Sequence, residues 1–224
     1  SMAPSLDKFV PTGDQSRDAS AEFYDYHREL LQNLISLYPN ERVAGAIKTL
    51  LAQSNVKQMS YSVSYWSDFI NDWPNIPAQP LSILNTTYFG NGTGNLYTRS
   101  SWNTNAIFVH TIAGVYDQSH AHKDQGSFML NSAGAWLFDD ANRRSNSGID
   151  QEEEYHNLVR FSAGGSTVRQ VEGAAPSQVV ALSDGTYFTY ELMNTKPIYN
   201  NKAEVVKSER EMVFIKSGAV VLFD

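Results

Sequence analysis

The chain has no cysteine among its 224 residues. Disulfide bonds and thiolate metal sites are therefore excluded, whereas the compartment is not restricted by this absence. The sequence also has no cluster of Lys and Arg, and its formal net charge is -7. Because contacts with phosphates need clustered positive charge, we expect no nucleic-acid partner. An anionic sugar polymer is less strongly excluded, since a local basic patch is enough to bind one.

Long apolar runs are missing as well. No segment approaches the ~20 apolar residues that cross a bilayer, so we expect no membrane partner. No signal peptide is found, but Ser1-Met2 is typical of a tag remnant before a start codon, so removal of an export signal is not excluded. What the sequence does have is 42% hydrophobic and 12% aromatic residues. This is enough for a buried core in one large β domain or two smaller units.

Helical spacing of apolar residues characterises the first 80 residues, after a loop at 1–17. The predicted helices run from Asp18 or Ser20 to Tyr38, onward from Asn40, and over 61–73. The first two of these helices form a hairpin that is too small to make a core alone, so they must pack on another part of the chain. Prolines between 74 and 80 mark the boundary of this helical part.

From residue 81 the pattern becomes that of β-strands, with short β-branched or aromatic runs separated by Gly, Asn, Ser and Asp. The predicted strands are 96–100, 106–112, 127–130, 135–138, 158–161, 178–182, 187–192, 204–215 and 219–223. This spacing predicts two sheets packed as a sandwich, so the fold class is α+β. The last run stops at Asp224 without a turn, as expected for a piece of a longer protein.

The histidines gather in one stretch. Three of the five, His120, His122 and His156, lie within 37 positions, with Asp139 and Asp140 between them. Imidazole and carboxylate are ligands that zinc accepts. Residues at i and i+2 of a strand point to one face, so His120 and His122 could reach the same ion or ligand. Asp139 and Asp140 face opposite ways on a strand, and the sequence does not decide which of them joins His122.

Three segments together resemble the heparinase II/III-like polysaccharide lyases, which include heparin and heparan lyases and oligoalginate lyases. They are GVYDQSHAHKDQGSF at 114–128, GAWLFD at 134–139, and His156-Asn157. The resemblance implies an α/α toroid of helical hairpins followed by an antiparallel β-sandwich, with the polysaccharide cleft between them. Residues 1–80 would then be the last hairpins of the toroid, and residues 81–224 the sandwich domain.

The activity implied by this resemblance is β-elimination, in which a base removes the C5 proton of a uronic acid and the 4-linked sugar leaves. The partner would be an anionic polysaccharide or oligosaccharide, and the location periplasmic or secreted. By the same resemblance, His120 assists catalysis, and His122, Asp139 and His156 bind zinc. Asp140 is the alternate ligand, and calcium is the second choice of metal.

Arginines are the candidates for binding the anionic substrate. Arg99 matches an arginine on the strand before the family's histidine motif, whose role is to pair with a carboxylate or to support the structure. Arg143 and Arg144 offer planar, two-pronged donors to carboxylate or sulfate, although a solvated loop is an equal alternative. The family's main catalytic tyrosine, and the Asn or Glu that helps it, come from parts of the toroid that this chain lacks. The missing toroid is therefore an expected partner, and the loop 141–154 also lacks the tyrosine of oligoalginate lyases.

Other residues have simpler interpretations, and two other functions remain. His27 and His110 are predicted to be hydrogen-bonded packing residues, and Glu152 to Glu154 a solvated charge run. A non-catalytic carbohydrate-binding or structural β-domain is one alternative function. A cupin-like metalloprotein is the other, but the glutamate that this motif needs is replaced by Gly126 or Ser127.

Overall fold

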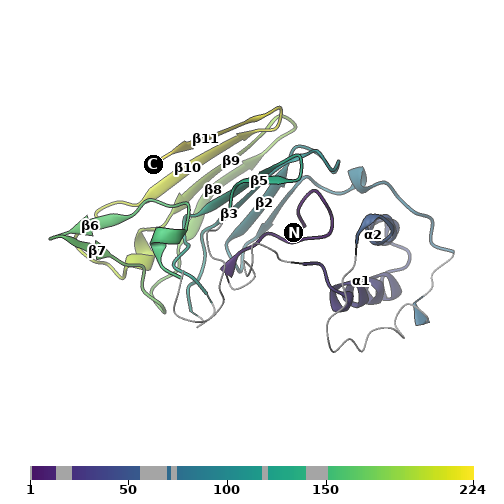
Figure 1. Ribbon diagram of the computed structural model, residues 1–224, viewed down its shortest axis with the longest axis horizontal. Helices are drawn as coiled ribbons and strands as arrows, with labels where there is room; N and C mark the ends of the chain where they lie inside the picture. Colours follow the sequence, from purple (N-terminus) through teal and green to yellow (C-terminus); the bar gives the residue numbers. More distant parts are fainter. Residues whose placement is uncertain (1, 14–21, 56–69, 72–74, 118–120, 140–150) are drawn as a thin grey trace.

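The computed structural model describes residues 2–13, 22–55, 70–71, 75–117, 121–139 and 151–224 (Figure 1). It has a helical hairpin at one end and a two-layered β-sandwich that makes up most of the rest. The α+β class predicted from the sequence is confirmed. The predicted helix at 61–73 lies almost wholly outside the described residues.

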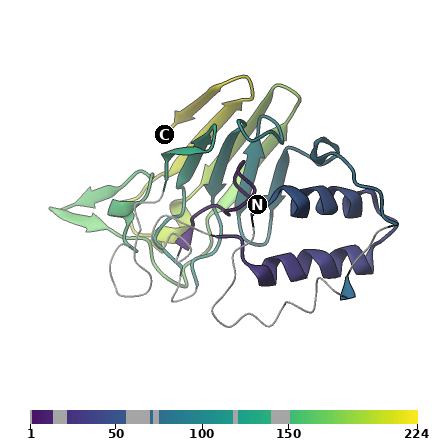
Figure 2. The same ribbon diagram turned by 45° about the vertical axis from the view of Figure 1, so that its right-hand side comes forward.

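Helices α1 (Asp25–Leu37) and α2 (Arg42–Gln53) lie side by side (Figure 2). Their apolar faces bury Ile35 and Leu51 against each other and against the N-terminal segment. The predicted start of the first helix is wrong by several residues. Instead of an Asp or Ser cap, the backbone N–H of Tyr24 donates to Nδ1 of His27 at 3.1 Å. Neither of these helices, nor any other in the described ranges, is long and apolar enough to cross a membrane.

The N-terminal segment, residues 2–10, has little regular structure but is part of the core. Met2 and Leu6 pack with the helical hairpin, while Val10 packs with Phe108 and Met129 of the sandwich. All five side chains are less than 10% exposed. The prediction of a loop here is correct in form, but the segment joins the two parts of the molecule by burying apolar surface against each of them.

The sandwich consists of two antiparallel meanders. The first sheet has the order β1 (Thr87–Gly90), β2 (Asn95–Arg99), β3 (Ile107–Ile112), β4 (Phe128–Ser132) and β5 (Ala135–Phe138). The second has the order β11 (Ala219–Phe223), β10 (Glu209–Ile215), β9 (Phe188–Asn194) and β8 (Gln178–Asp184). A separate hairpin pairs β6 (Phe161–Ala163) with β7 (Ser166–Val168). Short 3-10 turns lie at Leu81–Ile83, Glu153–Tyr155 and Lys196–Tyr199.

Strand prediction fails in a few places for identifiable reasons. β1 and β7 are too short to carry an alternating pattern, and neither was predicted. Residues 158–160 and 204–208 were predicted as strands but precede β6 and β10 as irregular chain.

The two sheets meet through alternating inward side chains. Leu96 and Val109 of the first sheet pack on Met212 and Phe214 of the second, and none of the four is exposed. Polar residues also cross this layer. Thr98 and Thr189 hydroxyls lie 2.8 Å apart, and Thr111 donates to Oε2 of Glu191 at 2.6 Å. Glu191 itself has no exposed surface.

Candidate functional site

Two of the predicted metal ligands lie together inside the protein. His122 is fully buried and His156 is 8% exposed, and their ring centroids are 5.5 Å apart. His122 lies in the chain that leads into β4, and His156 follows the 3-10 turn at Glu153–Tyr155. Two segments separated by more than thirty positions therefore meet at these rings.

Asp139, the third predicted ligand, is joined to them through the neighbour of His156. It comes directly after β5, and its side chain is half-buried. The side-chain amide of Asn157 donates to the backbone oxygens of Phe128, at 3.1 Å, and of Asp139, at 3.0 Å. One amide thus holds the start of β4 and the end of β5 beside His156.

The residues fit zinc in donor type. Two imidazoles and a carboxylate are a common zinc set, and burial of both rings leaves them shielded from water. The ligand atoms are not drawn together, however. Within the described ranges, the only three His or acidic side chains whose ligand atoms all lie within 4.8 Å of one another are Glu152, Glu153 and Glu154. Zinc binding would therefore have to bring the ligand atoms of His122, Asp139 and His156 closer together.

That acidic triplet already has a cation. Nη1 of Arg169 lies 3.2 Å from Glu152 and 2.7 Å from Glu153, and it also pairs with Glu154. The guanidinium lowers the pKa of the Glu154 carboxyl to about 2. Because Arg169 pairs with all three carboxylates, and Lys123 and Arg160 pair with Glu152 and Glu154, we assign no metal to this triplet.

Glu153 extends this cluster into the interior. It is 1% exposed, and its Oε1 accepts the backbone N–H of Gln170 at 2.6 Å. The Gln170 amide in turn exchanges two hydrogen bonds with the backbone of Gln125, at 2.9 and 3.1 Å. The prediction of a solvated charge run is therefore wrong for Glu153, which links the turn before His156 to the segment after His122.

Arg99, a predicted substrate-binding residue, is 2% exposed. Its guanidinium lies 4.0 Å from the ring centre of Trp102 and 5.0 Å from that of Phe108, and Nη2 donates to the backbone oxygen of Met2. Burial lowers its pKa to about 10. Here Arg99 is a packing partner of the N-terminal segment, which is the structural alternative stated above.

Four candidate residues lie outside the described residues: His120, Asp140, Arg143 and Arg144. Their roles stay predictions.

The packing roles predicted for the remaining two histidines are confirmed. His27 accepts the Tyr24 N–H and lies 4.7 Å from the ring of Phe9. His110 is buried, with Nε2 at 2.7 Å from Asn95, and burial lowers its pKa to about 3. Both rings are therefore structural.

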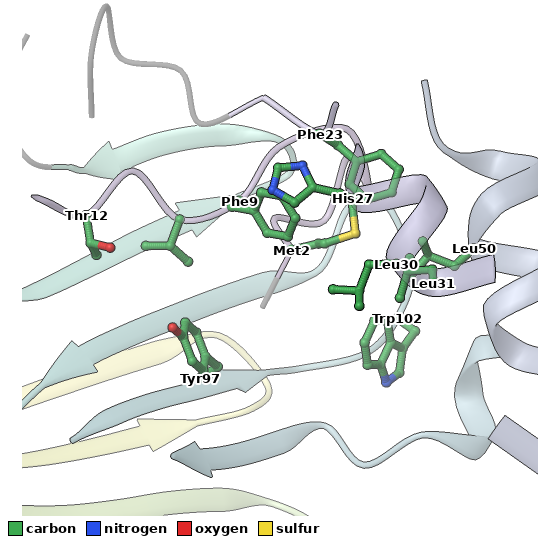
Figure 3. A pocket seen from close by; sticks show the side chains of 11 residues that line it. Met2, Phe9, Thr12, Phe23, His27, Leu30, Leu31, Leu50, Tyr97 and Trp102 are labelled. Atoms are coloured by element: carbon green, nitrogen blue, oxygen red, sulfur yellow. The ribbon is translucent and has the colours of Figure 1, made fainter. Parts of the chain in front are cut away.

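A cavity of about 550 Å³ lies between the N-terminal segment, the helical hairpin and β2 (Figure 3). Its lining is largely apolar and aromatic, and includes Phe9, Phe23, Leu30, Tyr97 and Trp102. None of the candidate site residues that the structure describes lines it. The cavity is separate from the histidine pair.

Sequence reasoning missed two residues that hold the site together, Asn157 and Arg210. Asn157 was noted only as part of the motif. Arg210 had a readable signal, because it shares the inward face of β10 with Met212 and Phe214 by simple alternation. A charged residue at such a position needs specific partners.

Comparison with known proteins identifies structures that share this fold. No family model matches the sequence, and no curated protein matches it. Solved structures do match over nearly all of the chain. A heparinase III gene product aligns with a TM-score of 0.66 and 16% identity, over 99% of this chain and 30% of its own.

Two further structures give the same result. A crystal structure of heparinase III aligns with a TM-score of 0.62 at 13% identity, over 99% of this chain and 31% of its own. Heparan sulfate lyase HepC from Pedobacter heparinus aligns with a TM-score of 0.60 at 15% identity, over 99% of this chain and 30% of its own. The resemblance predicted from the sequence is thus confirmed for the fold: the chain has the architecture found in heparinase III and heparan sulfate lyase, over about a third of their length.

Proposed function

We propose that this chain is part of a polysaccharide lyase that cleaves an anionic, uronic-acid-containing polysaccharide by β-elimination. The observation that carries the proposal is the burial of His122 beside His156, in a chain whose fold is that of a heparinase III. The proposal assigns heparan sulfate or a related glycosaminoglycan as the first substrate to test, since two of the structural neighbours bear that chemistry in their names. The rest of the toroid would complete the cleft.

Each residue has a distinct task in this proposal. His120 would face the substrate and exchange protons at the sugar, which imidazole does well near neutral pH. His122, Asp139 and His156 would hold zinc, with Asp140 as the alternate ligand. The bound ion would supply structural cross-linking of three β segments, as a closed zinc site does. Arg143 and Arg144 would bind the anionic groups of the polymer.

The test of the reaction is an ultraviolet absorbance assay for the unsaturated uronate. The longest natural polypeptide that contains this chain is offered heparan sulfate, heparin, chondroitin, hyaluronan and alginate, with His120→Ala and His27→Gln as matched variants. We expect a rise on one polymer that His120→Ala abolishes and His27→Gln retains. No rise on any polymer with folded, zinc-loaded protein would favour the carbohydrate-binding alternative.

The test of the metal is removal. A chelator is expected to lower the melting temperature of zinc-loaded protein, because the ion binds the folded state and not the unfolded one. His122→Ala should melt at the same temperature with and without chelator. A wild-type melting curve that chelation leaves unchanged contradicts the zinc assignment.

A further inference from the structure

Arg210 is a buried cation in the second sheet of the sandwich. It lies on the inward face of β10 with Met212 and Phe214, and it is 7% exposed. Taking a guanidinium out of water is unfavourable unless its donors find acceptors. Its partners are therefore informative about what it does.

The guanidinium connects three segments that are far apart in the sequence. Nη1 donates to the backbone oxygens of Gly126 and Asn157, both at 2.7 Å. Nε and Nη2 donate to the two carboxylate oxygens of Asp224, at 2.5 and 2.9 Å. Its carbon lies 5.8 Å from the ring centre of Phe128. Only a planar fork with several fixed donors satisfies all of these acceptors at once.

Two of these segments carry the candidate metal ligands. Gly126 follows His122 by four positions, and Asn157 is adjacent to His156. The Asn157 side chain in turn binds the backbone oxygen of Asp139. Arg210 and Asn157 thus form a frame across the segments that bear all three predicted ligands.

Gly126 shows why this connection controls position. Its φ of +91° is one that other residues rarely adopt, and its N–H donates to Ile112 at 2.7 Å. The peptide is therefore fixed by β3 on one side and by Arg210 on the other. If the guanidinium moved, the backbone of Gly126 would move with it, and so would the short segment that joins Gly126 to His122.

We propose that Arg210 is a positioning residue that sets the separation of His122 and His156 from a strand of the opposite sheet. The importance of this position for metal binding rests on the proposed function, whereas the test of the position itself does not. The hydrogen bonds of Arg210 go to the backbone oxygens of Gly126 and Asn157 and to the carboxylate of Asp224. Arg210 acts through the backbone at Gly126 and Asn157, as residues behind metal ligands commonly do.

The experiment compares three variants with wild type. Arg210→Lys keeps the charge and loses the fork, and Arg210→Met keeps the stem alone. Lys216→Met is the matched control, since Lys216 lies just beyond the other end of β10 and its side chain makes three hydrogen bonds, to Thr86, Asp184 and Gly185. Melting curves show how far each variant remains folded.

The first readout needs no metal. In chelated protein, nuclear Overhauser contacts between the ring protons of His122 and His156 should be present in wild type and Lys216→Met, and weakened or lost in both Arg210 variants. Contacts of wild-type strength in folded Arg210→Lys would overturn the proposal. So would their equal loss in Lys216→Met, because the effect would then be general destabilisation.

The second readout is zinc affinity, by competition with a coloured chelator. Arg210→Lys is expected to bind zinc about tenfold more weakly, the loss typical when support behind a metal ligand is removed, while Lys216→Met stays close to wild type. Unchanged affinity in folded Arg210→Lys would overturn the proposal. If wild type binds no zinc, the proposed metal role fails, and the metal-free ring contacts still decide the role of Arg210.

Discussion

The wild-type protein is expected to lose stability as the pH rises, because the buried Glu191 must become ionised. Replacing Glu191 with Gln is expected to remove this loss. Glu191 is fully buried between the two sheets, and burial raises the pKa of its carboxyl from 4.5 to about 7. The Thr111 hydroxyl donates to one oxygen. The other oxygen has no hydrogen-bond partner in the described part of the chain.

The sign follows from where the proton binds more tightly. The folded state holds this proton more strongly than the unfolded state, so its stabilising effect is complete below pH 4.5. The effect is lost as the pH rises through 7. A difference of ~2.5 pKa units corresponds to about 3 kcal/mol of unfolding free energy. Gln is neutral at every pH, so Glu191→Gln should match wild type near pH 4 and exceed its stability by up to about 3 kcal/mol near pH 8.

Urea denaturation of both proteins at a series of pH values measures this difference directly, because titration of all other groups cancels between them. Thr111→Val provides a second check. It removes the hydrogen bond that lowers this pKa, so the loss of stability should continue to a higher pH and become larger. A difference between Glu191→Gln and wild type that stays constant from pH 4 to pH 8 would refute the reasoning.

Two further substitutions test particular contacts. Gly94→Ala would put a Cβ 2.1 Å from the backbone oxygen of Ala113 at a φ of +70°, and should reduce the unfolding free energy by at least about 2 kcal/mol; a near-neutral result in urea titrations would show that the turn can shift. Arg169→Met removes the cation that faces the buried Glu153, and should cost about 2 kcal/mol, less than for a fully buried pair because Arg169 is 35% exposed. Addition of Glu153→Gln should recover part of that loss, and a double variant no more stable than Arg169→Met would contradict the explanation.

The sequence predicted the parts of this fold that depend on periodicity. Both helices and most strands of the sandwich follow from apolar spacing, and the histidine pair follows from the motif. The start of α1 could not be predicted, because His27 reaches back to cap it where an Asp or Ser was expected. The burial of Glu153 was missed for a different reason, since its partners Arg169 and Gln170 lie more than ten positions away.

Of the candidate site, the ligand types and the inward position of Arg210 were readable from the sequence, but the partners of Arg210 were not. Arg210 contacts Gly126 and Asn157 across the sandwich, and nothing local in the sequence reports on acceptors 53 and 84 positions away. Contacts of this kind exist only once both sheets are in place.

The packing of residues 2–10 bears on the order in which the protein is made. Met2 leaves the ribosome well before Arg99, whose side chain donates to the Met2 carbonyl from 97 positions later. The packing partners of Val10, Phe108 and Met129, are synthesised later still. This apolar stretch therefore stays without its partners in the sandwich until Arg99, Phe108 and Met129 have been made, while each meander can close hairpin by hairpin as it emerges. Residues 2–10 are thus synthesised before the sandwich but can pack against it only after its strands have formed.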